Sequence, residues 1–371
     1  EKMKADSLNN LVLLLEKKRR DSALFSLKKI QYPDNNRSLI FPFFKKLENA
    51  KYKKVRIMHY GDSQIEADRI TSYVRNELQK LFGGYGAGLF AVEQVTRKMS
   101  VKQTHSENWK RYAGFGRKKD TAIKHKKYGA LLAFSKYSPI IKSADSTNFS
   151  SWISIKKPTA SYSRTKNYQE LYLFYGNGAK KSHLQVLADS ALVFMDSLDS
   201  GSEVKFKKIN FSSTPKEIRL LFKAQESPDF YGLSIEGKNG VVMDNIPLRG
   251  ASGTEFSKQD KTCLKQMFDL LKPSLLILEF GGNTIPYIKS KERAYKYGRW
   301  FGSQIKLLKT LCPDAAILVI GPADMSKKEG TNFATYPLLS EVRNALKEQK
   351  FDVFIEMDAD FSHRFADLES I

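Results

Sequence analysis

The second half of the chain alternates short, continuously apolar runs with longer stretches of helical periodicity, and a segment near residue 55 has the same pattern. Strands that are apolar on both faces and are separated by helices are typical of a parallel sheet with helices on both sides. We therefore expect an α/β fold of three layers, α/β/α. The expected strands are 55–61, 240–246, 275–280, 316–320 and 351–356, and the expected helices are 68–81, 257–271, 290–311 and 336–349.

A different pattern occupies the interval between the first and second core strands. Short strand candidates follow one another there, separated by Gly, Asn, Ser and Pro, which is typical of an antiparallel sandwich. We therefore expect residues 95–238 to form an inserted β-sandwich, and residues 51–94 and 239–371 to form the α/β/α domain. The strand candidates of the insertion are 171–175, 183–187, 204–207 and 217–222.

A cluster of glycines at 83–88 precedes the insertion. It has neither the dinucleotide fingerprint nor the Lys-Ser/Thr pair of a phosphate-binding loop, so we interpret it as a flexible crossover. Four aromatic residues of the insertion, Trp109, Tyr112, Trp152 and Tyr162, lie among many lysines. Such residues could stack on sugar rings or bases, but in an all-β segment they are more often core, and we expect core.

Residues 1–50 are expected to form two polar-rich helices that pack on the core, one through Leu11–Leu15 and one through Phe41–Leu47. No stretch approaches the ~20 apolar residues that a transmembrane helix needs. The start of the chain is compatible with prior removal of a signal peptide. The two cysteines, Cys263 and Cys312, form no metal motif, fit buried positions in helices and leave the redox compartment open.

The chain is strongly basic, since 62 Lys and Arg residues against 40 Asp and Glu residues give a formal net charge of +22. Such an excess favours attraction to anionic polymers or membrane surfaces and carries no information on the fold. A lysine-rich surface without a specific anionic partner explains the charge equally well.

Ser63 lies where the first core strand turns into a helix, in the order Gly61, Asp62, Ser63. Open α/β sheets bind their ligands at the carboxyl ends of the strands, and a helix N-terminus there favours developing negative charge. A serine at this turn can therefore act as a nucleophile. It can equally cap the helix, because Ser and Asp are both preferred N-cap residues.

Three later segments favour catalysis. The second core strand runs into a loop in which Gly250 can offer its backbone N–H to an oxyanion. The third core strand is followed by two glycines and Asn283, whose side-chain amide is a second potential donor. The tail places a carboxylate, Asp360, and an imidazole, His363, three residues apart.

Serine, glycine, asparagine and histidine in this chain order resemble the SGNH (GDSL-like) hydrolase superfamily. The resemblance covers residues 51–90 and 240–325 and rests on the blocks HYGDSQIEADR, IPLRGASG and EFGGNT. The layout is similar to that of members with an inserted carbohydrate-binding-like β domain that act on O-acetylated cell-wall glycans. The resemblance implies a flavodoxin-like parallel sheet and chemistry that needs neither a metal nor an organic cofactor.

The same resemblance implies a role for each candidate residue. Ser63 would be the nucleophile, His363 the general base and Asp360 the partner that orients the base. The backbone N–H of Ser63, together with Gly250 and the side chain of Asn283, would form the oxyanion hole.

The tail has other interpretations. His363 could instead be a solvated histidine, in which case His59 on the first core strand becomes the next candidate base. Residues 356–363 also resemble the metal-binding Asp-x-Asp region of polyprenol-phosphate sugar transferases, but the nucleotide-binding region that should lie upstream is not recognisable.

The resemblance implies an esterase that removes O-acyl groups, in the first place O-acetyl groups, from an envelope polysaccharide or peptidoglycan in the periplasm or outside the cell. Nucleic acid is not expected as a partner. The alternatives are an O-acyltransferase that uses the same serine, a catalytically weak glycan-binding protein and, more distantly, a glycosyltransferase. The insertion is expected to bind the polymer while the core carries the chemistry; alternatively, the insertion forms a wall of the catalytic pocket.

Overall fold

The computed structural model describes residues 30–116, 120–140 and 147–356. Its centre is a five-stranded parallel sheet in the order β13-β1-β14-β15-β18. In order along the chain these strands are second, first, third, fourth and fifth, which is the flavodoxin-like arrangement expected. The strands are β1 (Lys54–Gly61), β13 (Gly240–Pro247), β14 (Pro273–Glu279), β15 (Ala316–Ile320) and β18 (Val353–Ile355).

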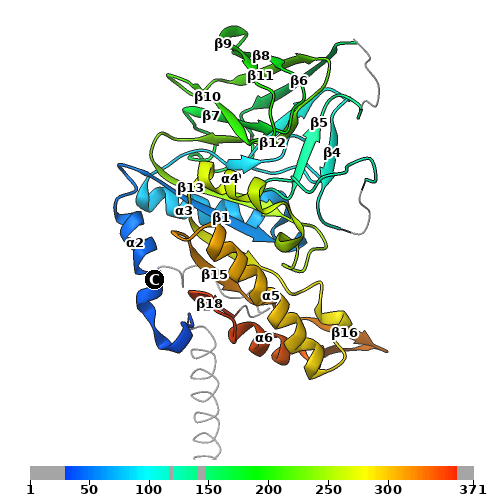
Figure 1. Ribbon diagram of the computed structural model, residues 1–371. Coiled ribbons are helices and arrows are strands. Elements are labelled where there is room, and N and C mark those ends of the chain that lie inside the picture. Colours follow the sequence, from blue (N-terminus) through cyan, green and yellow to red (C-terminus); the bar gives the residue numbers. More distant parts are fainter. Residues whose placement is uncertain (1–29, 117–119, 141–146, 357–371) are drawn as a thin grey trace, which may run out of the picture.

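Helices cover both faces of this sheet, which gives the three expected layers (Figure 1). Alternate side chains of a strand point to opposite faces. Val55 and Ile57 of β1 therefore join one hydrophobic cluster, whereas Met58 and Tyr60 join the other. The helices of the first face are α2 (Phe41–Glu48) and α3 (Arg69–Phe82), and those of the second are α4 (Lys261–Leu271), α5 (Lys291–Leu311) and α6 (Leu339–Lys347).

Two antiparallel sheets fill the interval between β1 and β13 and lie together on one side of the core (Figure 1). Buried residues of both sheets form a hydrophobic cluster that includes Trp109, and Tyr112 is buried in the cluster of the core, so these two aromatics are core as expected. The expectation is wrong for Trp152 and Tyr162, which are only half-buried and belong to neither cluster. The strands of the first sheet are, in order, β10 (Lys205–Asn210), β7 (Glu170–Gly176), β12 (Asp229–Glu236), β5 (Ala133–Lys136) and β4 (Lys110–Ala113). A sixth strand, β2 (Gly88–Phe90), pairs with β12 outside this order. The second sheet contains β3 (Lys102–His105), β6 (Phe149–Lys156), β11 (Glu217–Ala224), β8 (Ser182–Ala188) and β9 (Ala191–Leu198).

The glycines at 83–88 form a closely packed crossover, and not the flexible one that the sequence favoured. A Cβ on Gly84 would lie 2.4 Å from the carbonyl oxygen of Val241, and one on Gly86 would lie 2.1 Å from that of Ile235. Both residues also have positive φ, +111° and +89°. Glycine is therefore required here because two backbones approach each other, in a conformation that other residues rarely adopt.

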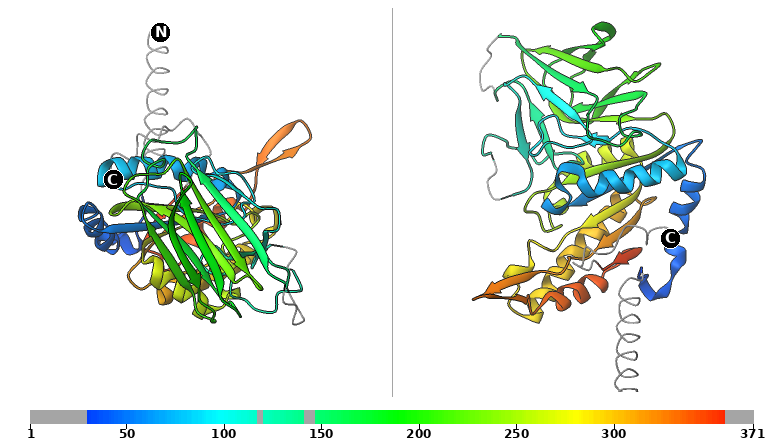
Figure 2. Two further views of the ribbon diagram at one scale, coloured as in Figure 1. Left: turned by 90° about the horizontal axis from the view of Figure 1, so that it is seen from above. Right: turned by 180° about the vertical axis from the view of Figure 1, so that it is seen from behind.

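A hairpin that the sequence did not predict lies between β15 and α6. It consists of β16 (Ser326–Glu329) and β17 (Asn332–Thr335), and it extends away from the body of the molecule (Figure 2). Its side chains are almost all exposed, so the strands lack the apolar alternation that identifies a half-buried strand.

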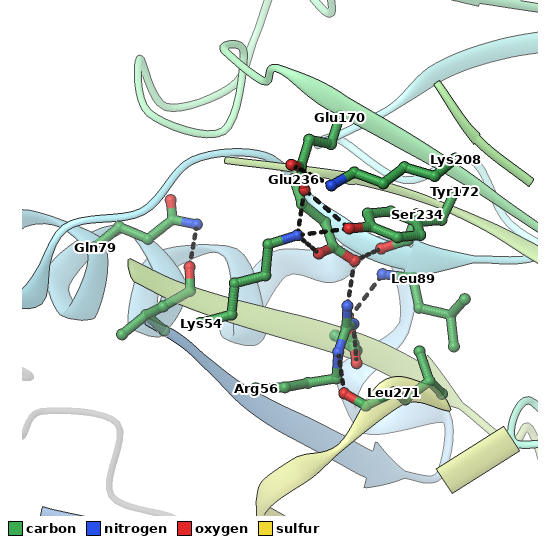
Figure 3. Close-up of polar contacts among 12 residues, drawn as sticks. Lys54, Arg56, Gln79, Leu89, Glu170, Tyr172, Lys208, Ser234, Glu236 and Leu271 are labelled. Carbon is green, nitrogen blue, oxygen red and sulfur yellow. Dashed lines mark hydrogen bonds and ion pairs between the residues drawn. The ribbon is translucent and has the colours of Figure 1, made fainter. Parts of the chain in front are cut away.

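A buried ionic network joins the parallel sheet to the first antiparallel sheet (Figure 3). Arg56 of β1 donates from Nη1 to both carboxylate oxygens of Asp244 on β13, at 2.7 and 2.9 Å, and from Nη2 to Glu236 on β12. Lys54 donates to Glu236 at 2.7 Å and to Glu170 on β7 at 2.5 Å. The network therefore connects strands that are far apart in the sequence, and its charges are compensated by one another.

The charges of the network set its dependence on pH. Burial alone would raise the pKa of Glu236, but the charges of Arg56 and Lys54 outweigh it and hold that pKa below the ordinary value. A carboxyl group whose pKa is lowered on folding stabilises the folded state above the ordinary carboxyl pKa. This stabilisation is lost as the pH falls through the lower pKa of the folded state.

Replacing Arg56 by methionine is expected to lower the free energy of unfolding by about 3–5 kcal/mol, because Asp244 and Glu236 would stay buried without their cation. Denaturant titration followed by circular dichroism at pH 7 measures the change. The matched control is Lys265→Met, which removes an exposed pair with Asp269 on α4 and should cost less than about 0.5 kcal/mol. Equal, small losses in both variants would contradict the role given to the network.

Candidate active site

The register of the parallel sheet brings three of the predicted site residues to one edge. Gly61 at the end of β1 pairs with Pro247 of β13 and with Glu279 of β14, so the three strands end at the same level. Ser63, Gly250 and Asn283 follow these strand ends within four residues. The boundary between β1 and β14 is the point where the strand order reverses, and open α/β sheets bind their ligands there.

Ser63 is the first residue of the short 3-10 helix η3 (Ser63–Asp68) and is exposed. The cap of η3 is Asp62, whose carboxylate accepts from the backbone N–H of Gln64 at 2.9 Å. The capping role that the sequence left open for Ser63 therefore belongs to Asp62. Within the described part of the chain the Ser63 hydroxyl makes no hydrogen bond, so it is free to meet a substrate.

Asn283 ties the three segments together through its side-chain amide. Nδ2 donates to Oδ2 of Asp62 at 3.1 Å and to the backbone carbonyl of Ala251 at 3.0 Å. Asp62 precedes Ser63, and Ala251 follows Gly250. Because both amide hydrogens are used in this way, an oxyanion bound by Asn283 has to replace one of the two acceptors.

Gly250 lies in an exposed loop with φ of +76°, a left-handed conformation that favours glycine. The preceding Arg249 forms a two-pronged ion pair with Glu66 of η3, from Nε and Nη2 at 2.6 Å each. This pair links the Gly250 loop to the helix that carries Ser63.

A buried polar layer supports η3 from below. Asn245 of β13 donates from Nδ2 to the carbonyl of Ile65 at 2.9 Å and to Oγ1 of Thr71 at 2.8 Å. Thr71 contacts Nδ1 of His59 at 3.0 Å, and Nε2 of His59 contacts Glu279 at 2.9 Å. Both ring nitrogens of His59 are hydrogen-bonded when the Thr71 hydroxyl donates to Nδ1 and the His59 Nε2–H donates to Glu279, an assignment that follows from the hydrogen-bond network.

His59 is therefore held in the structure and is not a free base. Its side chain is buried and both of its ring nitrogens have partners. The other described histidines, His105, His125 and His183, lie in the antiparallel region, on β3, before β5 and on β8. The predicted base His363 and its partner Asp360 lie outside the described residues.

Negative charge gathers around the candidate nucleophile. Burial raises the pKa of Asp62; the Gln64 N–H opposes this, and the charges of Glu279 and Glu66 add to it. Carboxylates at this edge stabilise a neighbouring cation, such as the imidazolium that a general base becomes. In the described ranges, no group of His, Cys, Asp and Glu side chains is arranged to hold a metal ion. No helix of these ranges combines the length and the apolar character needed to cross a bilayer.

The chain matches no family model and no curated protein, but it is similar to solved structures. A peptidoglycan O-acetylesterase is 17% identical to it, with a TM-score of 0.59 over 85% of this chain and 82% of that chain. A family two carbohydrate esterase from Clostridium thermocellum is 12% identical, with a TM-score of 0.23 over 58% and 84%. A protein described as a GDSL-like lipase from Bacteroides ovatus is 11% identical, with a TM-score of 0.24 over 70% and 87%. Of these three, only the first similarity is high enough to compare whole folds, and by it the chain shares the fold of that O-acetylesterase.

Proposed function

We propose that this protein is a serine esterase that removes O-acetyl groups from an envelope polysaccharide or peptidoglycan. The observation that carries the proposal is the Asn283 amide, which joins the residue before Ser63 to the residue after Gly250 at the switch point of the sheet. Ser63, Gly250 and Asn283, the proposed nucleophile and oxyanion donors, thus lie on three separate segments at one edge of the sheet. The peptidoglycan O-acetylesterase that shares the fold supports the choice of ester.

The proposed reaction has two steps. Ser63 Oγ attacks the acetyl carbonyl while His363 takes its proton, and the resulting oxyanion is bound by Asn283 and by the backbone N–H groups of Ser63 and Gly250. The tetrahedral intermediate collapses to an acetyl-serine and releases the sugar hydroxyl, which takes the proton from His363. Water then repeats the sequence and releases acetate. Asp360 holds the imidazole in the tautomer that accepts the proton.

The length of the tail is compatible with the role given to His363. Because the sheet is parallel, the chain leaves β18 at the same edge as Ser63. β14 and β15 lie between β1 and β18, so β1 and β18 are three inter-strand spacings apart. At about 4.8 Å per spacing, this distance is about 14 Å. His363 follows Ile355 by eight residues, and eight residues span at most ~27 Å.

The remaining parts of the proposal concern organisation and place. Residues 51–94 and 239–371 form the hydrolase domain, and residues 95–238 form an inserted β-sandwich that contributes to glycan binding. The substrate places the protein in the periplasm or at the cell surface. The net charge of +22 supports a polymer with negative charge.

Acetate release from O-acetylated peptidoglycan and from an acetylated polysaccharide tests the function. The purified protein is expected to release acetate, measured by a coupled enzymatic assay. An unacetylated glycan acceptor added to the same reaction detects transfer, because the acetyl group then appears on the acceptor. A protein that binds glycan without releasing or transferring acetate would contradict the proposal, and binding of a nucleotide sugar would favour the glycosyltransferase.

Replacing Asn283 by alanine is expected to lower kcat by about 100- to 1000-fold, the usual cost of losing one oxyanion donor. Turnover of p-nitrophenyl acetate measures the effect, and the melting temperature reports whether the three segments remain joined. Asn210→Ala, at an exposed asparagine at the end of β10, is the control. A folded Asn283→Ala enzyme with near-wild-type kcat would remove Asn283 from the oxyanion hole.

A further inference from the structure

A cavity of about 230 Å³ opens beside the candidate active site. Glu66 of η3 and Arg249 of the Gly250 loop line one side of it, so it borders two of the segments that carry the proposed chemistry. Arg111 and Ala113 of β4, with Phe115, also line it. The antiparallel region thus forms one wall of a cavity whose other wall is the parallel core. Its volume is below that of typical sites for drug-sized ligands and suits a single sugar residue.

Arg111 is the unusual member of this lining. Its guanidinium lies over the ring of Phe115, 5.6 Å from the centroid, and makes no hydrogen bond or ion pair with another described residue. Arg56 and Arg75, the buried arginines of the described chain, each bind a carboxylate through both of its oxygens, whereas Arg111 is half-buried. Arg111 has the same planar arrangement of N–H donors, which matches the geometry of a carboxylate, and it lines a cavity.

Two residues that line the same cavity each have a buried acceptor atom without a partner among the described residues. Asn245 is 1% exposed, and its Oδ1 has no hydrogen-bond partner, although its Nδ2 has two. Glu93 also has a buried carboxylate oxygen, Oε2, without a partner. Both atoms are fully buried, so a ligand with hydrogen-bond donors reaches them only when the two side chains turn toward the cavity. Sugar hydroxyls are such donors.

The charges in the cavity select the type of anion. Burial lowers the pKa of Arg111, and the charge of Glu93 opposes that shift, so the two side chains interact across the cavity without forming an ion pair. Lys98 also lines the cavity, but it already donates to the backbone carbonyl of Asn245. A singly charged carboxylate can bind Arg111 with Glu93 nearby, whereas a phosphate with up to two charges would be repelled more strongly by Glu93.

We infer that this cavity is a subsite for an acidic sugar, in which Arg111 binds the sugar's carboxylate. The inference rests on the proposed esterase function and specifies the substrate class of that site. It also gives the antiparallel region a direct part in the catalytic cleft, which is the alternative role that the sequence left open for the insertion.

The test compares two substrates that differ at one carbon. Mono-O-acetylated methyl glucuronide has a carboxylate at C6, and mono-O-acetylated methyl glucoside has a CH2OH group there. The measured quantity is the ratio of kcat/KM for the glucuronide to that for the glucoside, for the wild type and for Arg111→Met and Arg111→Lys. Methionine keeps an apolar side chain packed on Phe115. Lysine keeps the positive charge but lacks the bidentate donor geometry of the guanidinium.

The wild-type ratio is expected to favour the glucuronide by about 10- to 150-fold, the usual effect of a hydrogen-bonded charge pair. Arg111→Met should lose this preference, and Arg111→Lys should keep part of it. Arg97→Met, at an exposed arginine that does not line the cavity, should keep it fully. Melting temperatures of all variants show whether they fold.

Failure of the inference and failure of the proposed function give different results. An enzyme that hydrolyses p-nitrophenyl acetate through Ser63 but shows no preference for the glucuronide overturns the subsite alone. A preference that persists in Arg111→Met overturns the assignment to Arg111. A protein without esterase activity on any of the three esters overturns the proposed function itself.

Discussion

Replacing Ser63 by alanine is expected to lower kcat for p-nitrophenyl acetate and for O-acetylated glycans by at least about 10⁴-fold, because the acyl-enzyme can no longer form. The change should leave stability almost unaltered, since the side chain is exposed and its hydroxyl has no partner among the described residues. Steady-state kinetics and a thermal melt measure the two quantities.

The matched control for this variant is Ser212→Ala, at an exposed serine between β10 and β11. It should have wild-type kinetics. If Ser63→Ala retained the activity of the control, Ser63 would be neither the nucleophile nor a necessary part of the site.

Replacing His363 by alanine is expected to cost about as much as the loss of Ser63, because members of a catalytic triad act as a unit. Added imidazole should restore part of the lost activity in His363→Ala and none in Ser63→Ala, since only the first variant lacks a base and keeps its nucleophile. His183→Ala, at an exposed histidine on β8, is the control and should be unaffected.

Activity that survives in His363→Ala would contradict the triad and would make His59, on the first core strand, the next candidate base. His59 would then have to leave its hydrogen bonds with Thr71 and Glu279 to act as a base. The double variant with His59→Gln would measure that possibility directly, because glutamine can keep one of the two hydrogen bonds.

The layered core could be predicted from the sequence because its strands are continuously apolar. The strand at 316–320 has the expected bounds, and β1 and β13 begin or end within one residue of expectation. The parallel direction of these strands then implied that Ser63, Gly250 and Asn283 lie at one edge. Their positions at this edge follow from the topology alone.

Contacts between distant, polar residues could not be predicted in this way. The bond from Arg56 to Glu236 joins residues 180 positions apart, and no periodic pattern marks either partner. The choice of Asp62 over Ser63 as the cap depends on backbone geometry at the turn, since both residue types suit the position. Arg111 is one of 62 basic residues, and only its position in the fold, half-buried at the cavity and over the ring of Phe115, distinguishes it.

The central claim is that Ser63 forms a covalent acyl-enzyme, and a serine-directed phosphonate ester that mimics an acetyl group tests it most directly. After reaction, intact-mass measurement and peptide mapping should find one adduct per chain, located on Ser63, with acetate release lost in proportion to labelling. Labelling should be strongly slowed in His363→Ala. An adduct on a different serine, or an unlabelled protein that continues to release acetate, would contradict the account.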